Sequence, residues 1–283
     1  MKKGLIMEGG GMRGMFTCGV TDVFMENGIT FDGAAGISAS AVFRCNFKSH
    51  QPGRAIRYNK KYCKDPRYCG MRSLMKTGDF FGVDFCYHEI PEVLDPFDTE
   101  TFRNDPMEFY VGATDIKTGD ILYHKCEDGG ERDIEWMRAS ASLPLVSRPV
   151  KVDGYLLMDG GIVDPIPYRY MESLGYDRNV IILTQPKGFV KKKDKTLPLI
   201  KARFSKFPAI SFAMAVRHVR YNIQTKDIEE REAAGEAFVI RPPEPLGIGR
   251  AVKDPEELER VYQIGRKEAE RVLDDVKSYL AGE

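Results

Sequence analysis

The chain has 283 residues, with 42 Lys and Arg against 42 Asp and Glu, and 42% of its residues are hydrophobic. This composition is typical of a soluble globular protein and excludes disordered, collagen-like and coiled-coil chains. A formal net charge of zero argues against a protein that holds nucleic acid through a large basic surface.

The N-terminus carries no recognisable export or membrane signal. Only a short apolar run separates Lys2 and Lys3 from Glu8, and no stretch of the chain approaches the roughly 18 apolar residues of a spanning helix. The six cysteines lack zinc-like spacing, so we expect reduced thiols. These features predict a cytoplasmic protein, which can also associate peripherally with a membrane.

The first fifty residues alternate between short apolar runs and helical patterns. Residues 3–8 predict a buried strand that ends in a glycine-rich turn, and helical spacing follows until Asn27. Residues 29–37 predict a second strand, and residues 39–47 predict a second helix. This order predicts an α/β fold, a three-layer sandwich with a mainly parallel central sheet.

The rest of the chain continues this pattern less regularly. Residues 54–97 show weak periodicity, and we expect helices and loops beside the sheet. The final helix has the clearest signals, because Asp254 is a suitable N-cap and Pro255 favours the first helical position. Strands are predicted at 108–114, 120–124, 150–158 (a hairpin), 180–184 and 237–241, and helices at 134–142, 208–232 and 255–280.

We expect residues 1–283 to form a single domain, since no linker, repeat or low-complexity tract divides them. The chemical motifs lie within residues 4–166. Residues 187–283 are expected to contribute a basic segment, helices and a last strand that pack on the sheet.

The first motif is a glycine-rich turn between the first strand and the first helix. Residues 9–14 (Gly-Gly-Gly-Met-Arg-Gly) match G-x-G-x-x-G, whose missing side chains let backbone N–H groups approach an anion. A dinucleotide site would need an acidic residue at the end of the second strand, whereas Asp32 lies at its start. An oxyanion therefore fits better than a nucleotide, and a tight turn without a ligand is the alternative.

The second motif is Ser38 at a strand-to-helix turn, between Gly36 and Ser40. Such a turn exposes a serine hydroxyl and aims a helix N-terminus at the reacting centre. The pattern departs from G-x-S-x-G only at Ser40, and an ordinary N-cap serine is the alternative.

The third motif, Asp159-Gly160-Gly161, follows a predicted strand and offers a carboxylate, although such a string is more often a simple turn. A donor cradle, an exposed serine and a carboxylate at strand ends are together the parts of acyl transfer.

The three motifs, in this order, resemble those of the bacterial patatin-like phospholipases, and residues 139–144 resemble the segment that precedes the Asp motif in that family. The resemblance implies a serine lipid acyl hydrolase that cleaves phospholipids or lysophospholipids through a Ser-Asp dyad and an acyl-enzyme intermediate, with no cofactor. It makes Ser38 the nucleophile and Asp159 the base. The remaining roles that it implies are an oxyanion hole of Gly9, Gly10, Gly11 and Arg13, and motif support from Gly14, Gly36, Ser40, Gly160 and Gly161.

Two alternatives stay open. Ser38, Asp159 and His218 follow the chain order of an α/β-hydrolase triad, but the charged residues around His218 favour a solvated helix face. A catalytically silent lipid-binding protein of the same fold is the second alternative, because the family has Gly where this chain has Ser40.

Lys187–Lys206 is a basic segment with interleaved apolar residues. Such a segment can dock on anionic lipid, and a basic loop leading into a packed helix is the alternative. No cluster of His, Cys, Asp or Glu shows ligand spacing, so we expect no metal.

Overall fold

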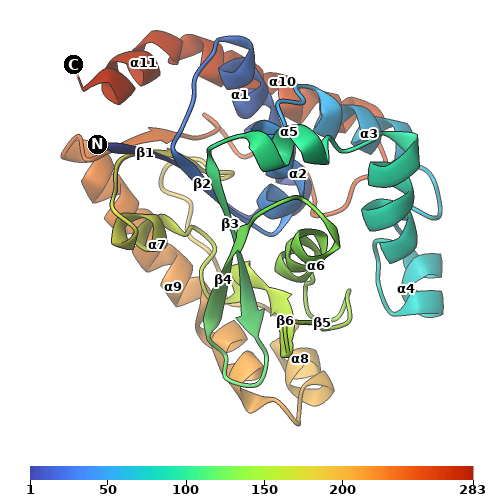
Figure 1. Ribbon diagram of the computed structural model, residues 1–283. Helices are drawn as coiled ribbons and strands as arrows, with labels where there is room; N and C mark the ends of the chain where they lie inside the picture. The colour runs from blue at the N-terminus through green and yellow to red at the C-terminus, as the bar shows by residue number, and fades with distance from the viewer. Residues whose placement is uncertain (283) are drawn as a thin grey trace.

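A central sheet organises the computed structural model, which describes residues 1–282 (Figure 1). Five neighbouring strands of this sheet pair in parallel, in the spatial order β3, β2, β1, β7 and β8. Strands β4 and β6 pair with β3, and β5 pairs with β6, in the antiparallel sense. The strand order is β5 (Val150–Val152), β6 (Tyr155–Asp159), β3 (Glu108–Asp115), β2 (Gly33–Ile37), β1 (Lys2–Met7), β7 (Tyr176–Ile182) and β8 (Ala237–Ile240), with β4 (Ile121–Cys126) paired to β3.

Helices cover both faces of this sheet, which gives the three layers that the sequence predicts. Strand β1 shows why, since Leu5 and Met7 point into one hydrophobic core and Ile6 points into the other. The first core is covered by α1 (Gly14–Glu26), α2 (Ala39–Lys48), α6 (Glu131–Ser140) and α10 (Pro255–Arg271), and the second by α7 (Tyr168–Ser173) and α9 (Pro208–Ala233).

The remaining helices lie around these layers. No helix within residues 1–282 is both long and apolar enough to cross a membrane. The remaining helices are α3 (Arg54–Tyr62), α4 (Met71–Thr77), α5 (Thr99–Asn104), α8 (Leu197–Arg203) and α11 (Leu273–Ala281). Short 3₁₀ turns η1 (Gly11–Arg13) and η3 (Gly160–Ile162) and a π-helical segment η2 (Phe85–Leu94) complete the set.

Most predicted elements are present, with shifted ends. Strand β2 begins at Gly33 rather than at residue 29, because the chain first bends at Asp32, whose N–H donates to the Lys3 carbonyl at 2.9 Å. The final predicted helix is divided at Val272 into α10 and α11. Asp254 caps α10 as predicted, accepting the Glu256 N–H at 3.0 Å.

The register of β3 brings the ends of β2 and β6 together. One edge of β3 pairs with β4 as far as Thr114, so β2 and β6 must share the other edge. Along it, the last residue of β2, Ile37, pairs with Gly112, and the last residue of β6, Asp159, pairs with Ala113. Because β2 runs parallel to β3 and β6 runs antiparallel, the two strands meet end to end.

Helices α1 and α10 cross at backbone contact through a pair of glycines. A Cβ added at Gly19 would lie 2.1 Å from the Tyr262 carbonyl oxygen, and one added at Gly265 would lie 2.0 Å from the Phe16 carbonyl oxygen. Such distances are far below van der Waals contact. The crossing therefore anchors the C-terminal part of the chain directly to the helix that follows the glycine-rich turn.

We expect Gly265→Ala to destabilise the protein by about 3 kcal/mol, because the helices must separate to accept the methyl group. Urea unfolding followed by circular dichroism measures this change. Gly249→Ala is the matched control, since its added Cβ meets its nearest heavy atom at 3.6 Å, and its stability should change by less than about 1 kcal/mol. Equal midpoints for the two variants would contradict the close crossing.

Candidate active site

Ser38 occupies the sharp turn between β2 and α2. Its φ of 59° and ψ of −126° are unusual for a residue with a side chain, and they mark a strained turn held by its surroundings. The turn needs small neighbours, since a Cβ at Gly36 would lie 2.7 Å from the Ser40 carbonyl oxygen. The Ser38 N–H donates to Ser140 Oγ at 2.9 Å, which fixes the turn from the end of α6.

The Ser38 hydroxyl donates directly to the carboxylate at the end of β6. The distance from Ser38 Oγ to Asp159 Oδ2 is 2.7 Å. The other carboxylate oxygen accepts the Gly161 N–H at 2.7 Å, and the Asp159 N–H donates to the Ser142 carbonyl at 2.8 Å. Both oxygens are thus oriented before any substrate arrives.

Burial raises the pKa of Asp159 above its ordinary value, while hydrogen bonds from Ser38 and the Gly161 N–H and the positive charge of Arg217 oppose that rise. The net direction makes this carboxylate a stronger base than an exposed aspartate. A stronger base is better able to accept a serine proton.

Ser40, the departure from the glycine pattern, fits without crowding Ser38. Its hydroxyl donates to the Glu8 carbonyl at 2.7 Å, and its side chain is buried. The extra hydroxyl therefore ties the start of α2 to the end of β1 instead of disturbing the turn.

The glycine-rich turn lies beside Ser38, but its three N–H groups are not equivalent. The Gly9 N–H already donates to the Pro165 carbonyl at 3.2 Å, which corrects the prediction that Gly9 is an oxyanion donor. Gly11 has a φ of 57°, and a Cβ there would lie 2.9 Å from the Arg250 carbonyl oxygen. Within residues 1–282, the N–H groups of Gly10 and Gly11 have no protein acceptor.

Most of the remaining predicted residues surround this centre. Gly9, Gly10, Gly11, Arg13, Ser38, Asp159 and Gly161 border one cavity of about 400 Å³. Gly160 lies behind it, where a Cβ would be 2.2 Å from the Gly112 carbonyl oxygen, and Gly14 packs against Phe43.

His218 was expected on a solvated face of its helix, and that expectation is wrong. It borders the same cavity from α9, and its Nδ1 is buried without a hydrogen-bond partner in the described part of the chain. The Ser38 hydroxyl nevertheless donates to Asp159 directly, with no imidazole between them. Helical periodicity predicted the helix but could not tell which of its faces meets the sheet.

Sequence reasoning missed the cationic side of the cavity. Arg217 donates through Nε to the Gly161 carbonyl, beside Asp159. Lys191 enters from the loop after β7, and Arg250 from the loop after β8. Lys191 belongs to the basic segment Lys187–Lys206, which was expected to meet lipid or solvent, and no motif marks Arg217 or Arg250.

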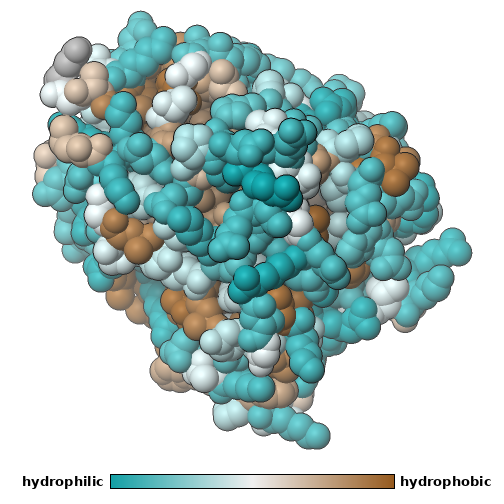
Figure 2. All heavy atoms as spheres, viewed as in Figure 1, coloured by the Kyte–Doolittle hydropathy of each residue, from teal (hydrophilic) through white to brown (hydrophobic). Residues whose placement is uncertain are grey.

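The basic segment Lys187–Lys206 is only partly exposed. Three of its apolar side chains, Leu197, Ile200 and Phe204, belong to a hydrophobic core and cannot enter a membrane. Leu199 remains 63% exposed. The viewed face of the molecule is mainly hydrophilic, with small separate hydrophobic patches (Figure 2).

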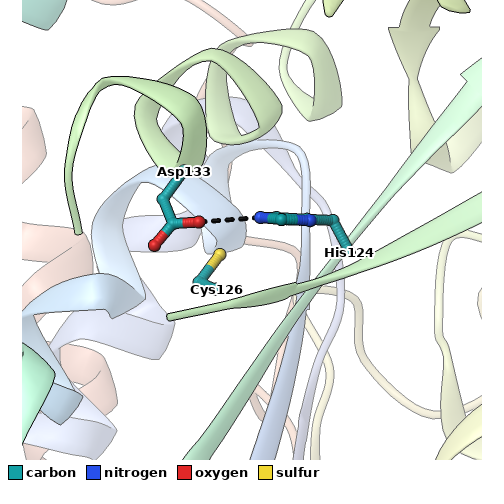
Figure 3. A group of neighbouring side chains, drawn as sticks. All are labelled: His124, Cys126 and Asp133. Carbon is teal, nitrogen blue, oxygen red and sulfur yellow. Dashed lines mark hydrogen bonds and ion pairs between the residues drawn. The ribbon is translucent and has the colours of Figure 1, made fainter. Parts of the chain in front are cut away.

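The fold also gathers His124, Cys126 and Asp133, whose ligand atoms lie within 4.8 Å of one another (Figure 3). His124 Nε2 is 2.7 Å from Asp133 Oδ1, and Asp133 Oδ2 accepts three backbone N–H groups from residues 127–129. Burial raises the pKa of Cys126 well above its usual value, which disfavours the thiolate that metals bind. Asp133 therefore acts as the anchor of this loop. His124 and Cys126 are two residues apart, which places both side chains on one face of β4. This spacing is the sequence signal that could have revealed the cluster.

Two family models match the chain. Residues 5–171 match the patatin-like phospholipase model, and residues 207–281 match a domain of unknown function, DUF6363.

The curated relatives include the uncharacterized protein YjjU of Escherichia coli, 27% identical over 270 residues and covering 93% of this chain and 74% of that protein. Lysophospholipase nte1 of Aspergillus terreus is 24% identical over 297 residues, covering 97% of this chain, which spans only 18% of that protein. Among solved structures, VipD from Legionella pneumophila is 14% identical with a TM-score of 0.47, covering 97% of this chain and 67% of that one.

Proposed function

Because the chain belongs to the patatin-like phospholipase family, whose members are lipid ester hydrolases, we propose that it cleaves the acyl esters of phospholipids or lysophospholipids through a Ser38–Asp159 dyad. The observation that carries this proposal is the 2.7 Å hydrogen bond from the serine hydroxyl to a buried carboxylate. Fungal relatives named lysophospholipases support the substrate class.

The proposed reaction has two stages, acylation and deacylation, and in each of them Asp159 first accepts a proton and then returns it. Asp159 takes the hydroxyl proton while Ser38 Oγ attacks the ester carbonyl, and the N–H groups of Gly10 and Gly11 stabilise the oxyanion, with Arg13 beside them. Collapse of this intermediate gives the acyl-enzyme, and Asp159 returns the proton to the departing alcohol. Water, deprotonated by Asp159, then attacks the acyl-enzyme, and Ser38 regains its proton as the fatty acid leaves.

The catalytically silent alternative is less well supported. That alternative was suggested by Ser40, whose hydroxyl donates to the Glu8 carbonyl and leaves the turn at Ser38 undisturbed.

We also propose that the chain acts as one domain, because α10 packs on α1 and α9 borders the cavity.

We expect Ser38→Ala and Asp159→Asn each to lower kcat/KM for a soluble short-chain ester by at least about 1,000-fold, since each removes a member of the proton-transfer pair. We expect His218→Ala to keep activity within about tenfold of the unchanged protein, since the dyad needs no imidazole. Steady-state kinetics on folded variants measures all three.

Labelling by a fluorophosphonate probe is the control, because only an activated serine reacts. Labelling should be present in the unchanged protein and absent in Ser38→Ala. A folded His218→Ala variant as inactive as Ser38→Ala would overturn the dyad in favour of the triad.

We expect kcat/KM to fall in acid with a midpoint above the ordinary aspartate pKa of about 3.9. Burial raises the pKa of Asp159, and the residue accepts a proton only when ionised, so activity is lost as the pH drops through the raised value. A pH profile with a soluble ester measures the midpoint. The same acid limb should persist in His218→Ala, and its disappearance there would point to the imidazole.

We further propose that the protein contacts anionic membranes transiently through the surface around α8. Leu199 on α8 is 63% exposed, and Phe212 on α9, which packs against α8, is 65% exposed. Lys193, Lys195 and Lys201 are exposed in or just before α8. Basic side chains beside exposed apolar ones are the combination that binds anionic interfaces.

We expect the double variant Leu199→Ser with Phe212→Ser to bind phosphatidylglycerol vesicles about tenfold more weakly, because it removes two apolar insertions. Vesicle sedimentation measures the change. Val93→Ser is the control, since Val93 is 69% exposed on η2, and its vesicle binding should be unaltered. Unchanged binding by the double variant would remove the proposed surface.

A further inference from the structure

Two cavities of different chemistry meet at Ser38. The first, of about 400 Å³, contains the dyad and is strongly cationic. The second, of about 350 Å³, is largely apolar and is lined by Val42, Phe43, Phe80, Phe81, Leu145 and Val146 among others. Ser38, Gly11 and Arg250 border both. An ester whose carbonyl lies at Ser38 can therefore extend one part into each cavity.

The positive charge of the first cavity is not balanced by its own carboxylates. Its lining holds two carboxylates, Asp159 and Asp194, against five basic side chains, so positive charge remains in excess. Both carboxylates accept hydrogen bonds from neutral groups, Asp159 from Ser38 and Gly161 and Asp194 from Thr196. Within residues 1–282, no ion pair within 4.0 Å joins a carboxylate to any of the five basic side chains of the lining. Those side chains are Arg13, Lys191, Lys192, Arg217 and Arg250.

These cations are held close together despite their mutual repulsion. Lys191 Nζ lies over the Tyr221 ring, 4.2 Å from its centroid. Burial and the guanidinium groups of Arg217, Arg13 and Arg250 lower its pKa to about 8, although the charge of Glu8 opposes this shift. Arg217 is held by the Gly161 carbonyl, and the Arg250 carbonyl accepts the Met12 N–H at 3.3 Å. A multiply charged anion between them would relieve this repulsion.

We propose that Lys191, Arg217 and Arg250 form a phosphate subsite, which selects acyl esters whose alcohol carries an anionic phosphate, with the acyl chain in the apolar cavity. Guanidinium groups match phosphate oxygens in geometry and charge. A choline group would add positive charge to this cavity, so lysophosphatidic acid is favoured over lysophosphatidylcholine. Arg217 and Arg250 both lie within residues 207–281, so this part of the chain supplies two of the three basic side chains that select the alcohol group of the substrate.

The subsite deepens the proposed function and rests on it. Its test compares kcat/KM for monoacylglycerol, lysophosphatidic acid and lysophosphatidylcholine with one acyl chain, as monomers. We expect Lys191→Gln and Arg250→Gln to lower the ratio of lysophosphatidic acid to monoacylglycerol about 10- to 100-fold, because each removes a charge-assisted contact. Lys191→Arg keeps the charge and should keep the ratio within about threefold.

Lys267→Gln is the matched control, since it removes the same charge from an exposed position of α10 and should leave the ratio unaltered. If Lys191→Gln and Arg250→Gln also leave the ratio unaltered while monoacylglycerol is hydrolysed, the subsite is wrong and the hydrolase stands.

A binding measurement separates the subsite from catalysis. Calorimetry on Ser38→Ala protein with glycerol 3-phosphate, glycerol and inorganic phosphate needs no turnover. We expect glycerol 3-phosphate to bind, glycerol not to bind, and Lys191→Gln in the Ser38→Ala background to weaken the binding about tenfold. If inorganic phosphate binds and glycerol 3-phosphate does not, the site holds an ion rather than a headgroup, and the proposal is overturned. Absent hydrolysis and absent fluorophosphonate labelling in the unchanged protein would instead count against the hydrolase.

Discussion

The shared edge of β3 is the constraint on which the site depends. Two strands of opposite direction use consecutive positions of this edge, Gly112 and Ala113, and neither can extend further without displacing the other. Their last residues must therefore face each other across a few ångströms. The hydroxyl of Ser38 and the carboxylate of Asp159 meet because the sheet leaves their strands no other place to end. The approach of the two side chains is thus set by backbone hydrogen bonds between strands, which buried polar groups of the main chain must form.

Several groups compensate for the cost of this arrangement. A serine with positive φ is strained, and a carboxylate away from water is costly to ionise. The Ser140 hydroxyl oxygen accepts the Ser38 N–H and so holds the strained turn, and the Gly161 N–H and Arg217 stabilise the ionised carboxylate. Strain and buried charge around Ser38 and Asp159, the pair proposed to react, lower the stability of the protein, as is common at functional sites.

The sequence predicted the elements better than the contacts between distant segments. Strands and hairpins follow from local patterns, so the layered α/β fold and the positions of Ser38 and Asp159 at strand ends were predictable. The orientation of α9 depends on packing against the sheet, which local periodicity does not encode, and this is why His218 was misplaced and Arg217 was missed. The Gly9 error has a similar origin, because its acceptor at Pro165 is more than 150 residues away in the chain. Residues 54–97 show no clear periodicity in the sequence. In the structure they form several short helices, and no sequence motif predicts where these helices begin and end.

The glycine crossing of α1 and α10 also has a consequence for how the protein is made. Helix α1 emerges early in synthesis, but the surface around Phe16 and Gly19 that α10 covers stays bare until more than 230 further residues have been added. The glycine-rich turn beside Ser38 leads directly into α1, so it gains its full support only after α10 has docked. During synthesis, Ser38, the proposed nucleophile, therefore lies beside a turn whose supporting layer is the last part of the fold to be made.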